Sequence, residues 1–536
     1  MEYGPLSLLP PLLAIILCIA TRQVLPALFI GVWVGALIVA SWNPLAATTL
    51  TFSWIIENVT DSWNATILLF DFIIGAMVAL IYASGSMHSL AELLSKRIKT
   101  ARGASFATSI LGILIFFDDY SNTVIVGNAM RSLTDRLRVS RELLSYIVDS
   151  TAAPIAGLMF ISTWIGYEVG LIKEAFKSLT PKPSVEAYFA WLMSVPYRYY
   201  SILAIILVLL VVLTRRHYGG MLKAEHRVVS EGKVLRDGAS PLMPTETVLG
   251  NVKARAPPSL FAYSVIGLVI VTLLGMWVTG AEDPSKWWET PFTEALMNAD
   301  AATALLWGSF VGYLIASVIV LLGGYMRFSE WIDYTIKGMY LMILPNAILV
   351  LAWSIKTACD SVGTANYVVG LAEAMGIPAL TVPFIIFLIA YFISFTTGTS
   401  WGTFGVTMPI AIPMAWSLAH AQGVDPYIVT YASIASVFAG GIFGDHCSPI
   451  SDTTIMSSMF SAADHVDHVT TQIPYAVTAA GVSAILFLLF AMGLTHPAIL
   501  LPVGIVILVI AHRVINVQYA KKVKLPPVVP NYTTSS

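Results

Sequence analysis

The sequence predicts an all-α polytopic membrane protein, and its composition, its charge balance and its long uncharged stretches each support that fold class. Of the 536 residues, 57% are hydrophobic and only 11% are charged, and the mean hydropathy is +0.78. Soluble domains carry about 25% charged residues. The hydrophobic composition makes the lipid bilayer an expected partner. The net charge of −2 provides no basic surface for a nucleic acid, so no nucleic acid is expected as a partner.

Long uncharged stretches define the expected spans, because a membrane-crossing helix needs about 20 mostly apolar residues. Stretches without Asp, Glu, Lys or Arg occur at 3–21, 23–56, 72–91, 103–117, 150–167, 199–214, 256–281, 301–326, 338–355, 374–424, 426–444 and 468–512. Several are long enough for two crossings, and we expect about 11 full spans. The three cysteines, Cys18, Cys359 and Cys447, are far apart in the sequence, so neither a disulfide nor a structural zinc site is expected.

Lysine and arginine in short loops indicate the orientation, since these residues remain on the cytoplasmic side. Basic clusters occur at 96–102, at 131–141 and throughout 215–257, whereas the loops 43–64 and 281–300 are acidic or neutral. Because the tail is also basic, the C-terminus is expected in the cytoplasm and the N-terminus outside. The expected domains are a first inverted repeat at 1–214, a cytoplasmic linker at 215–257, a second inverted repeat at 258–515 and a cytoplasmic tail at 516–536.

Two segments are predicted to enter the membrane and leave it on the same side. Basic clusters flank 103–130 at both ends, so this segment is expected to be a re-entrant hairpin entered from the cytoplasm. In the second half, the span count makes 379–424 a hairpin entered from the opposite face. The alternative is that each hairpin is a pair of ordinary short spans.

The polar interruptions of the first half recur in the second half. The polar stretch 118–123 follows an apolar helix, and 396–403 does so about 280 residues later. Asp149 and Asp445 each precede a small-Pro-Ile-small motif that breaks a helix. An odd number of spans separates the two copies, so their topology is inverted. Broken helices in both halves of an inverted repeat point to a substrate site at the membrane midplane.

The first hairpin tip carries Asp118 and Asp119, followed by Ser121, Asn122 and Thr123. A charged carboxylate within the membrane costs at least about 2.5–3.5 kcal/mol, so it indicates a function. The hydroxyl and amide oxygens that follow suit a hard cation such as sodium. The alternative for the whole tip is helix capping near the water interface.

The run 440–458 combines glycines, a proline, ionisable groups and hydroxyls, which no lipid-facing helix would carry. Its candidate site residues are Asp445, His446, Ser448, Asp452 and Thr453. His446 is of the residue type that titrates near neutral pH. A nearby group of ionisable residues, Asp464, His465, Asp467 and His468, is predicted to be a hydrated surface loop, with metal binding as the alternative.

These motifs resemble those of a known family. The run 444–454 (GDHCSPISDTT) resembles the signature of the NhaC-type Na⁺/H⁺ antiporters of the ion transporter superfamily, and 117–123 (FDDYSNT) is similar to that family's first hairpin. The resemblance extends from about residue 5 to residue 515. The second hairpin tip departs from the Ser-Asn-Thr pattern of the superfamily, because 399–403 is TSWGT. This departure argues against a symmetric dicarboxylate site.

The resemblance and the intramembrane carboxylates together predict a secondary active antiporter that exchanges Na⁺ for H⁺ in a prokaryotic plasma (inner) membrane. One or more carboxylates would bind either a proton or a sodium ion, so the two ions would compete. The expected sodium ligands are Asp118, Asn122, Asp149, Asp445 and Asp452, and neutral oxygens would come from Ser121, Thr123, Ser400, Thr403, Ser448 and Thr453.

Other functions are weighed against antiport. The chain has no GxxxxGK[ST] motif, so an ion gradient must supply the energy; no enzymatic activity is expected, and no cofactor besides the transported sodium. Relatives of the NhaC type include malate/lactate exchangers and a drug-efflux protein. The alternative is therefore a Na⁺-coupled transporter or exchanger of a small organic anion or amino acid. A homo-oligomer is left open.

Overall fold

The computed structural model describes residues 3–21, 23–86, 98–116, 119–159, 179–185, 187–242, 255–297, 299–364 and 378–533, together with isolated residues in the gaps between them. Over these ranges the chain is built of helices and turns, and its β-structure consists of two isolated bridges. The predicted all-α class is therefore confirmed for the described residues.

Seven described helices are long and apolar enough to cross a membrane: Asn64–Ala83, Pro258–Gly280, Ala302–Leu322, Ala379–Thr397, Pro426–Cys447, His465–Ala491 and Pro497–Val523. An eighth span is possible if Phe189–Tyr197 and Tyr199–Thr214, which are bent by 50° relative to each other, count as one. These helices confirm a polytopic membrane protein. The expected total of about 11 spans stays a prediction.

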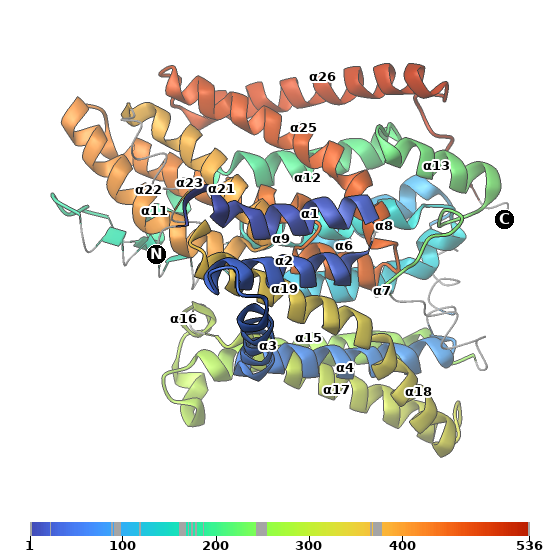
Figure 1. The fold of residues 1–536 in the computed structure, drawn as a ribbon. Helices are drawn as coiled ribbons and strands as arrows, with labels where there is room; N and C mark the ends of the chain where they lie inside the picture. The colour runs from blue at the N-terminus through green and yellow to red at the C-terminus, as the bar shows by residue number, and fades with distance from the viewer. Residues whose placement is uncertain are drawn as a thin grey trace.

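The helices form layers (Figure 1). In the lower layer, α4 (Ser62–Ala83) packs against α17 (Ala301–Leu322) and α18 (Phe328–Leu341), and α17 packs against α15 (Pro258–Gly280). At the top lie α12 (Tyr199–Thr214), α13 (Gly220–Glu231), α25 (His465–Ala491) and α26 (Pro497–Val523). The remaining helices are α1 (Leu9–Thr21), α2 (Val24–Val39), α3 (Pro44–Thr60), α6 (Ala101–Leu114), α7 (Asp119–Arg136), α8 (Arg141–Thr151), α9 (Ala153–Ala156), α11 (Ala187–Ser194), α16 (Phe292–Met297), α19 (Ile343–Ser361), α21 (Val382–Thr397), α22 (Ser400–Gln422), α23 (Pro426–Cys447) and α24 (Asp452–Phe460).

Each segment predicted as a hairpin contains two successive helices. The first pair is α6 and α7, and Thr100 caps the start of α6 through its hydroxyl. The second pair is α21 and α22, separated by Gly398 at φ +69°, a conformation that glycine adopts without strain. Whether each pair turns back inside the membrane stays a prediction.

Helices α21 and α23 approach each other so closely that their backbones touch. A Cβ atom on Gly440 would lie 2.3 Å from the Phe387 carbonyl oxygen, and one on Gly444 would lie 2.5 Å from that of Tyr391. Small residues permit this approach between apolar helices, where van der Waals packing drives association. The close approach holds the polar end of α23 against the second helix pair.

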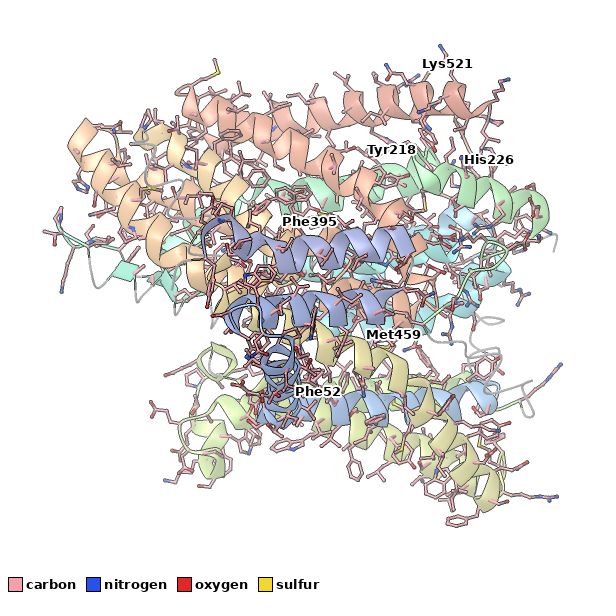
Figure 2. All side chains as sticks on the ribbon, in the orientation of Figure 1. Phe52, Tyr218, His226, Phe395, Met459 and Lys521 are labelled. Atoms are coloured by element: carbon pink, nitrogen blue, oxygen red, sulfur yellow. The ribbon has the colours of Figure 1, made fainter. Side chains whose placement is uncertain are left out.

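The segment expected to be a cytoplasmic linker is anchored to the helices around it. It contains α13, and buried Arg215 and Glu225 form an ion pair at 2.8 Å that fixes α13 to the end of α12. Arg227 pairs with Glu142 of α8 at 3.0 Å. In Figure 2, Tyr218 and His226 mark this region; Tyr218 stacks on Tyr475 of α25 with ring centroids 4.3 Å apart. At the other end of the chain, α26 continues to Val523, past the boundary expected at residue 515.

Candidate functional site

The site is built where helices break. Helix α23 ends at Cys447, the chain is extended at Ser448, and α24 begins after Ser451, whose hydroxyl accepts a hydrogen bond from the Thr454 backbone N–H. Helix α8 ends at Thr151, and Ala152 has the non-helical angles φ −86° and ψ −94°. Proline shortly after each break prevents the helix from continuing unchanged. The two breaks bring Asp149, Asp445 and Asp452 into one buried region.

Asp149 is completely surrounded by hydrogen-bond donors. Its Oδ1 accepts from the Ser457 hydroxyl at 3.1 Å, and its Oδ2 accepts from the Thr454 hydroxyl at 3.1 Å and from the Gln472 amide. The Gln472 amide also donates to the His446 backbone carbonyl. Asp149 thereby ties α8 to α24 and α25, and it is the most fully paired of the carboxylates in the site.

Asp445 is only half paired. Its Oδ2 accepts a hydrogen bond from Ser400 Oγ at 2.7 Å and a longer one from Thr453 Oγ1 at 3.4 Å. Its Oδ1 is buried and accepts no hydrogen bond from any described residue. Ser400 is the first residue of α22, so the second helix pair contacts the carboxylate directly. One oxygen of Asp445 is therefore available to a ligand.

Asp452 joins the first helix pair to the site. Its Oδ2 accepts from the Tyr120 hydroxyl at 2.6 Å, and its Oδ1 accepts from the backbone N–H of Thr453 at 2.8 Å. Asp452 is the first residue of α24, where the helix dipole favours a negative charge. Next to Tyr120, Asp119 Oδ1 accepts from the Trp164 indole at 3.0 Å.

Asn122 joins three helices through its side-chain amide. Its amide nitrogen donates to the carbonyls of Gly112, Ile115 and Thr151 at 2.6, 2.9 and 3.0 Å, which joins α6, α7 and the break after α8. Its Oδ1 accepts no hydrogen bond from the part of the chain that the structure describes. The nitrogen is therefore committed to the fold, and only the oxygen remains for the ion that the sequence predicts here.

Other predicted site residues donate to backbone carbonyls or lie outside the described residues. Thr123 donates to the Tyr120 carbonyl, Thr403 to that of Thr399, and Ser448 to that of Phe395. Figure 2 labels Phe395, at the end of α21, and Met459, on α24. Asp118 and the side chain of Ser121 lie outside the described residues.

His446 connects three helices. Its Nε2 forms a hydrogen bond with Ser150 Oγ at 2.9 Å, and its Nδ1 forms one with the Tyr200 hydroxyl at 2.6 Å. These partners belong to α8 and α12, whereas His446 belongs to α23. With both ring nitrogens occupied, the imidazole fixes the relative positions of the helices behind the carboxylates.

The prediction of a hydrated loop at His465 and His468 is wrong. Both side chains are buried, and Ser458 Oγ lies within hydrogen-bond distance of both Nδ1 atoms, at 2.9 and 2.8 Å. His468 Nε2 bonds to the Gln472 Oε1 at 2.8 Å and lies 3.8 Å from Asp149 Oδ2. His465, His468 and Gln472 follow one another at intervals of three and four residues, so they lie on one face of α25. This polar stripe in the sequence was the signal that the face is buried in the site.

Charge balance determines what the site can do. Within the described ranges, no Lys or Arg forms an ion pair with Asp149, Asp445 or Asp452. Buried carboxylates without such partners are costly in the ionised form, so they bind protons or cations. No described group of three or more His, Cys, Asp or Glu side chains is arranged to hold one metal ion. An ion here would instead be held by few carboxylates together with neutral oxygens.

The hydrogen bonds of Asn122 should contribute to the stability of the fold. Replacing Asn122 with alanine should lower the free energy of unfolding by about 1–3 kcal/mol, because buried carbonyls lose their donor. The melting temperature of the purified protein in detergent measures this effect. Thr123→Val, which removes one hydrogen bond within the same helix, is the control and should cost less. Equal melting temperatures for Asn122→Ala and wild type would contradict the holding role.

The chain is similar in sequence to known antiporters. The model of the Na⁺/H⁺ antiporter family matches residues 155–492, which include Ser400, Asp445 and Asp452. An uncharacterised protein of Haemophilus influenzae is 34% identical over 501 residues, 91% of each chain. The malate-2H⁺/Na⁺-lactate antiporter of Bacillus subtilis is 36% identical over 100 residues, 19% of this chain and 20% of that antiporter. The arginine/ornithine antiporter of Halobacterium salinarum is 26% identical over 193 residues, 36% of this chain and 37% of that protein.

Proposed function

The chain belongs to the Na⁺/H⁺ antiporter family, and from this premise we propose that it exchanges Na⁺ for H⁺ by competition of the two ions for a buried carboxylate, Asp445. As a member of that family the chain is a transporter and not an enzyme. The observation that carries the proposal is the half-paired state of Asp445, whose Oδ1 is buried and accepts no hydrogen bond from a described residue.

The neighbouring oxygens suit a small cation. Ser400 Oγ and Thr453 Oγ1 lie 2.7 and 3.4 Å from Asp445 Oδ2, and a hydroxyl has lone pairs to offer as well as a proton to donate. Hard cations prefer such oxygen ligands. When Asp445 is protonated, the negative charge that attracts sodium is lost, so a proton that enters from the side to which the site is open displaces sodium to that same side. After the site has turned to the other side, the proton leaves and sodium binds there.

Movement of the hairpins would alternate access to the site. We propose that 1–214 and 258–515 are inverted repeats, in about 11 spans with two re-entrant hairpins, and that 215–257 and 516–536 face the cytoplasm. Two contacts support a moving hairpin: Ser400 at the second tip bonds to Asp445, and Tyr120 beside the first tip bonds to Asp452 at 2.6 Å. The N-terminus is proposed to lie outside, in a prokaryotic plasma membrane.

The topology has its own test. Cysteines introduced at Ser121 and at Ser400, in a chain whose native cysteines are replaced, should react with a membrane-impermeant maleimide from opposite sides in inward- and outward-biased states. The reason is that the two hairpins enter from opposite faces. Labelling is measured by mass shift in right-side-out and inverted vesicles. Reaction at position 121 from the outside in every state would overturn this topology.

The function is tested by reconstituting the purified protein into liposomes with a pH-sensitive dye inside. An imposed Na⁺ gradient should drive protons in the opposite direction, whereas an equal gradient of an impermeant cation should not. Absence of sodium-driven proton movement, in liposomes that contain correctly inserted protein, would reject the proposal.

A second candidate is a Na⁺-coupled exchanger of a small organic anion or amino acid. The similarity to a malate-2H⁺/Na⁺-lactate antiporter and to an arginine/ornithine antiporter favours it, although each match covers well under half of this chain. The same liposomes loaded with malate, lactate, arginine or ornithine distinguish the two. Proton movement that requires one of these solutes would favour the second candidate.

A further inference from the structure

A carboxylate outside the candidate site is buried in the middle of a membrane-spanning helix. Asp71, between Phe70 and Phe72, is the one Asp, Glu, Lys, Arg or His in α4, and it is 0% exposed. Neither of its oxygens accepts a hydrogen bond from a described residue. In the sequence, Asp71 stands at the edge of the uncharged stretch 72–91 and belongs to none of the polar motifs. A buried ionisable group in a span indicates a function by default.

Contacts on both sides place Asp71 beside a broken helix. One turn before it, the Asn346 amide donates to the Leu68 carbonyl at 3.3 Å. One turn after it, a Cβ atom on Gly75 would lie 2.6 Å from the Gly338 carbonyl oxygen. Along these antiparallel helices, residue 71 is thus level with Met342, where α18 ends and α19 begins.

The broken helix offers a carbonyl acceptor that lacks its usual helical donor. Pro345, in the first turn of α19, has no backbone N–H, so the carbonyl four residues earlier, that of Leu341, loses its usual helical partner. An ionised Asp71 would find no compensation in such surroundings, whereas a protonated Asp71 is neutral and carries an O–H to donate to a carbonyl. The neighbourhood of Asp71 therefore suits a carboxylic acid.

Charged groups on the surrounding helices do not offset Asp71. Helices α15 and α17 contain no Asp, Glu, Lys, Arg or His. On α18, Lys337 is paired with Asp333 at 2.8 Å on an exposed face. On α7, neither Arg131 nor Arg136 donates a hydrogen bond to Asp71, whose two oxygens accept none from the described residues. The acids of α3, α7 and α19 (Glu57, Asp119, Asp135 and Asp360) have the same sign of charge as Asp71 when ionised and offset nothing.

Residues of α4 line two cavities. Leu68 and Phe72 line an apolar groove of about 610 Å³, and Val78 lines a cavity of about 10 Å³. Asp71 lines neither of these two spaces. A proton needs no cavity of its own, so it is the occupant that these surroundings suit.

We propose that Asp71 is a second proton-binding site, separate from the carboxylates of the candidate site and loaded with a proton in this conformation. Helix α19 lies between the two sites, because it packs against α4's partner α18 and against α24, the helix of Asp452. Movement of α24 would therefore disturb the break at Met342 and open Asp71 to water, where its proton leaves. The inference rests on the proposed Na⁺/H⁺ exchange and adds one proton to each cycle.

The test compares coupling ratios in liposomes. For wild type and Asp71→Asn, the Na⁺ gradient that exactly halts proton movement is measured at several fixed membrane potentials and pH gradients. Asparagine has nearly the shape of aspartate but holds no transferable proton. The variant should move one proton fewer per sodium ion, with sodium affinity at the candidate site within about twofold of wild type.

Controls separate the possible outcomes. Asp333→Asn, on the exposed face of neighbouring α18, should keep the wild-type ratio. If Asp71→Asn is not recovered in the membrane, Asp71→Ser, which is smaller and also lacks the proton, takes its place. An unchanged ratio in the Asp71 variant overturns this inference alone, whereas wild-type protein that moves no protons in response to sodium overturns the proposed function.

Discussion

Replacement of Asp445 by asparagine should abolish sodium-driven proton movement while the protein still inserts into the membrane. Asparagine preserves the shape and can keep a hydrogen bond to Ser400, which lies 2.7 Å from the carboxylate in wild type. It carries no charge to attract sodium and cannot exchange a proton. Loss of a required ionisable group removes the exchange step itself, so we expect a decrease in rate of at least about 100-fold.

The measurement is the initial rate of proton movement after a sodium pulse in liposomes, with insertion checked by the yield and melting temperature of the variant. Asp333→Asn is the matched control, because it removes a carboxylate that is paired with Lys337 at the surface. Transport by Asp445→Asn at the wild-type rate would eliminate Asp445 as the exchanging group. Asp452→Asn would then be the next variant to test, since Asp452 is a partly buried carboxylate of the same region.

The second large effect is on the pH dependence of sodium binding. Protons and sodium ions compete for the same carboxylate, so a fall in pH fills the site with protons and weakens the apparent sodium affinity. Below the pH at which the carboxylate is half protonated, the apparent dissociation constant for sodium should rise about tenfold for each unit by which the pH falls, if one proton is displaced per sodium ion bound. Sodium affinity therefore improves as pH rises and then levels off.

Isothermal titration of the purified protein with sodium at several pH values measures this slope. Buffers of different ionisation enthalpy also report how many protons leave when sodium binds. A sodium affinity that stays constant from about pH 5.5 to pH 9, around the ordinary histidine value near 6.5, would exclude simple competition. It would favour the organic-solute exchanger, in which sodium is a second substrate.

His446 and the His465–His468 pair affect how such data are interpreted. His446 bonds to Ser150 and to Tyr200, and the other two rings share Ser458, so none of the three faces water directly. A histidine-like inflection in sodium binding that is lost in His446→Gln would therefore come from this network. An inflection that remains in His446→Gln, His465→Gln and His468→Gln would be assigned to a carboxylate.

Several properties follow from the sequence alone. Composition and uncharged stretches determine a polytopic α-helical membrane protein, because apolar residues at this density can be satisfied only in lipid. The run 444–454 identifies the family and the region of the site, since charged and hydroxyl groups beside glycine and proline would be unstable on a lipid-facing helix. These signals are local in the chain and need no knowledge of packing.

Tertiary structure alone decided how the ionisable groups are paired. Asp149 and Asp445 look equivalent in the sequence, yet Gln472, Ser457 and Thr454 surround the first, and one oxygen of the second is left without a donor. His465 and His468 look like a hydrated loop, but packing of α25 against α24 buries them. Asp71 looks like the boundary of an uncharged stretch, but packing of α4 against α17 and α18 buries it. The physical reason is that the energy of a charge depends on the donors and water around it, and residues distant in sequence supply those donors.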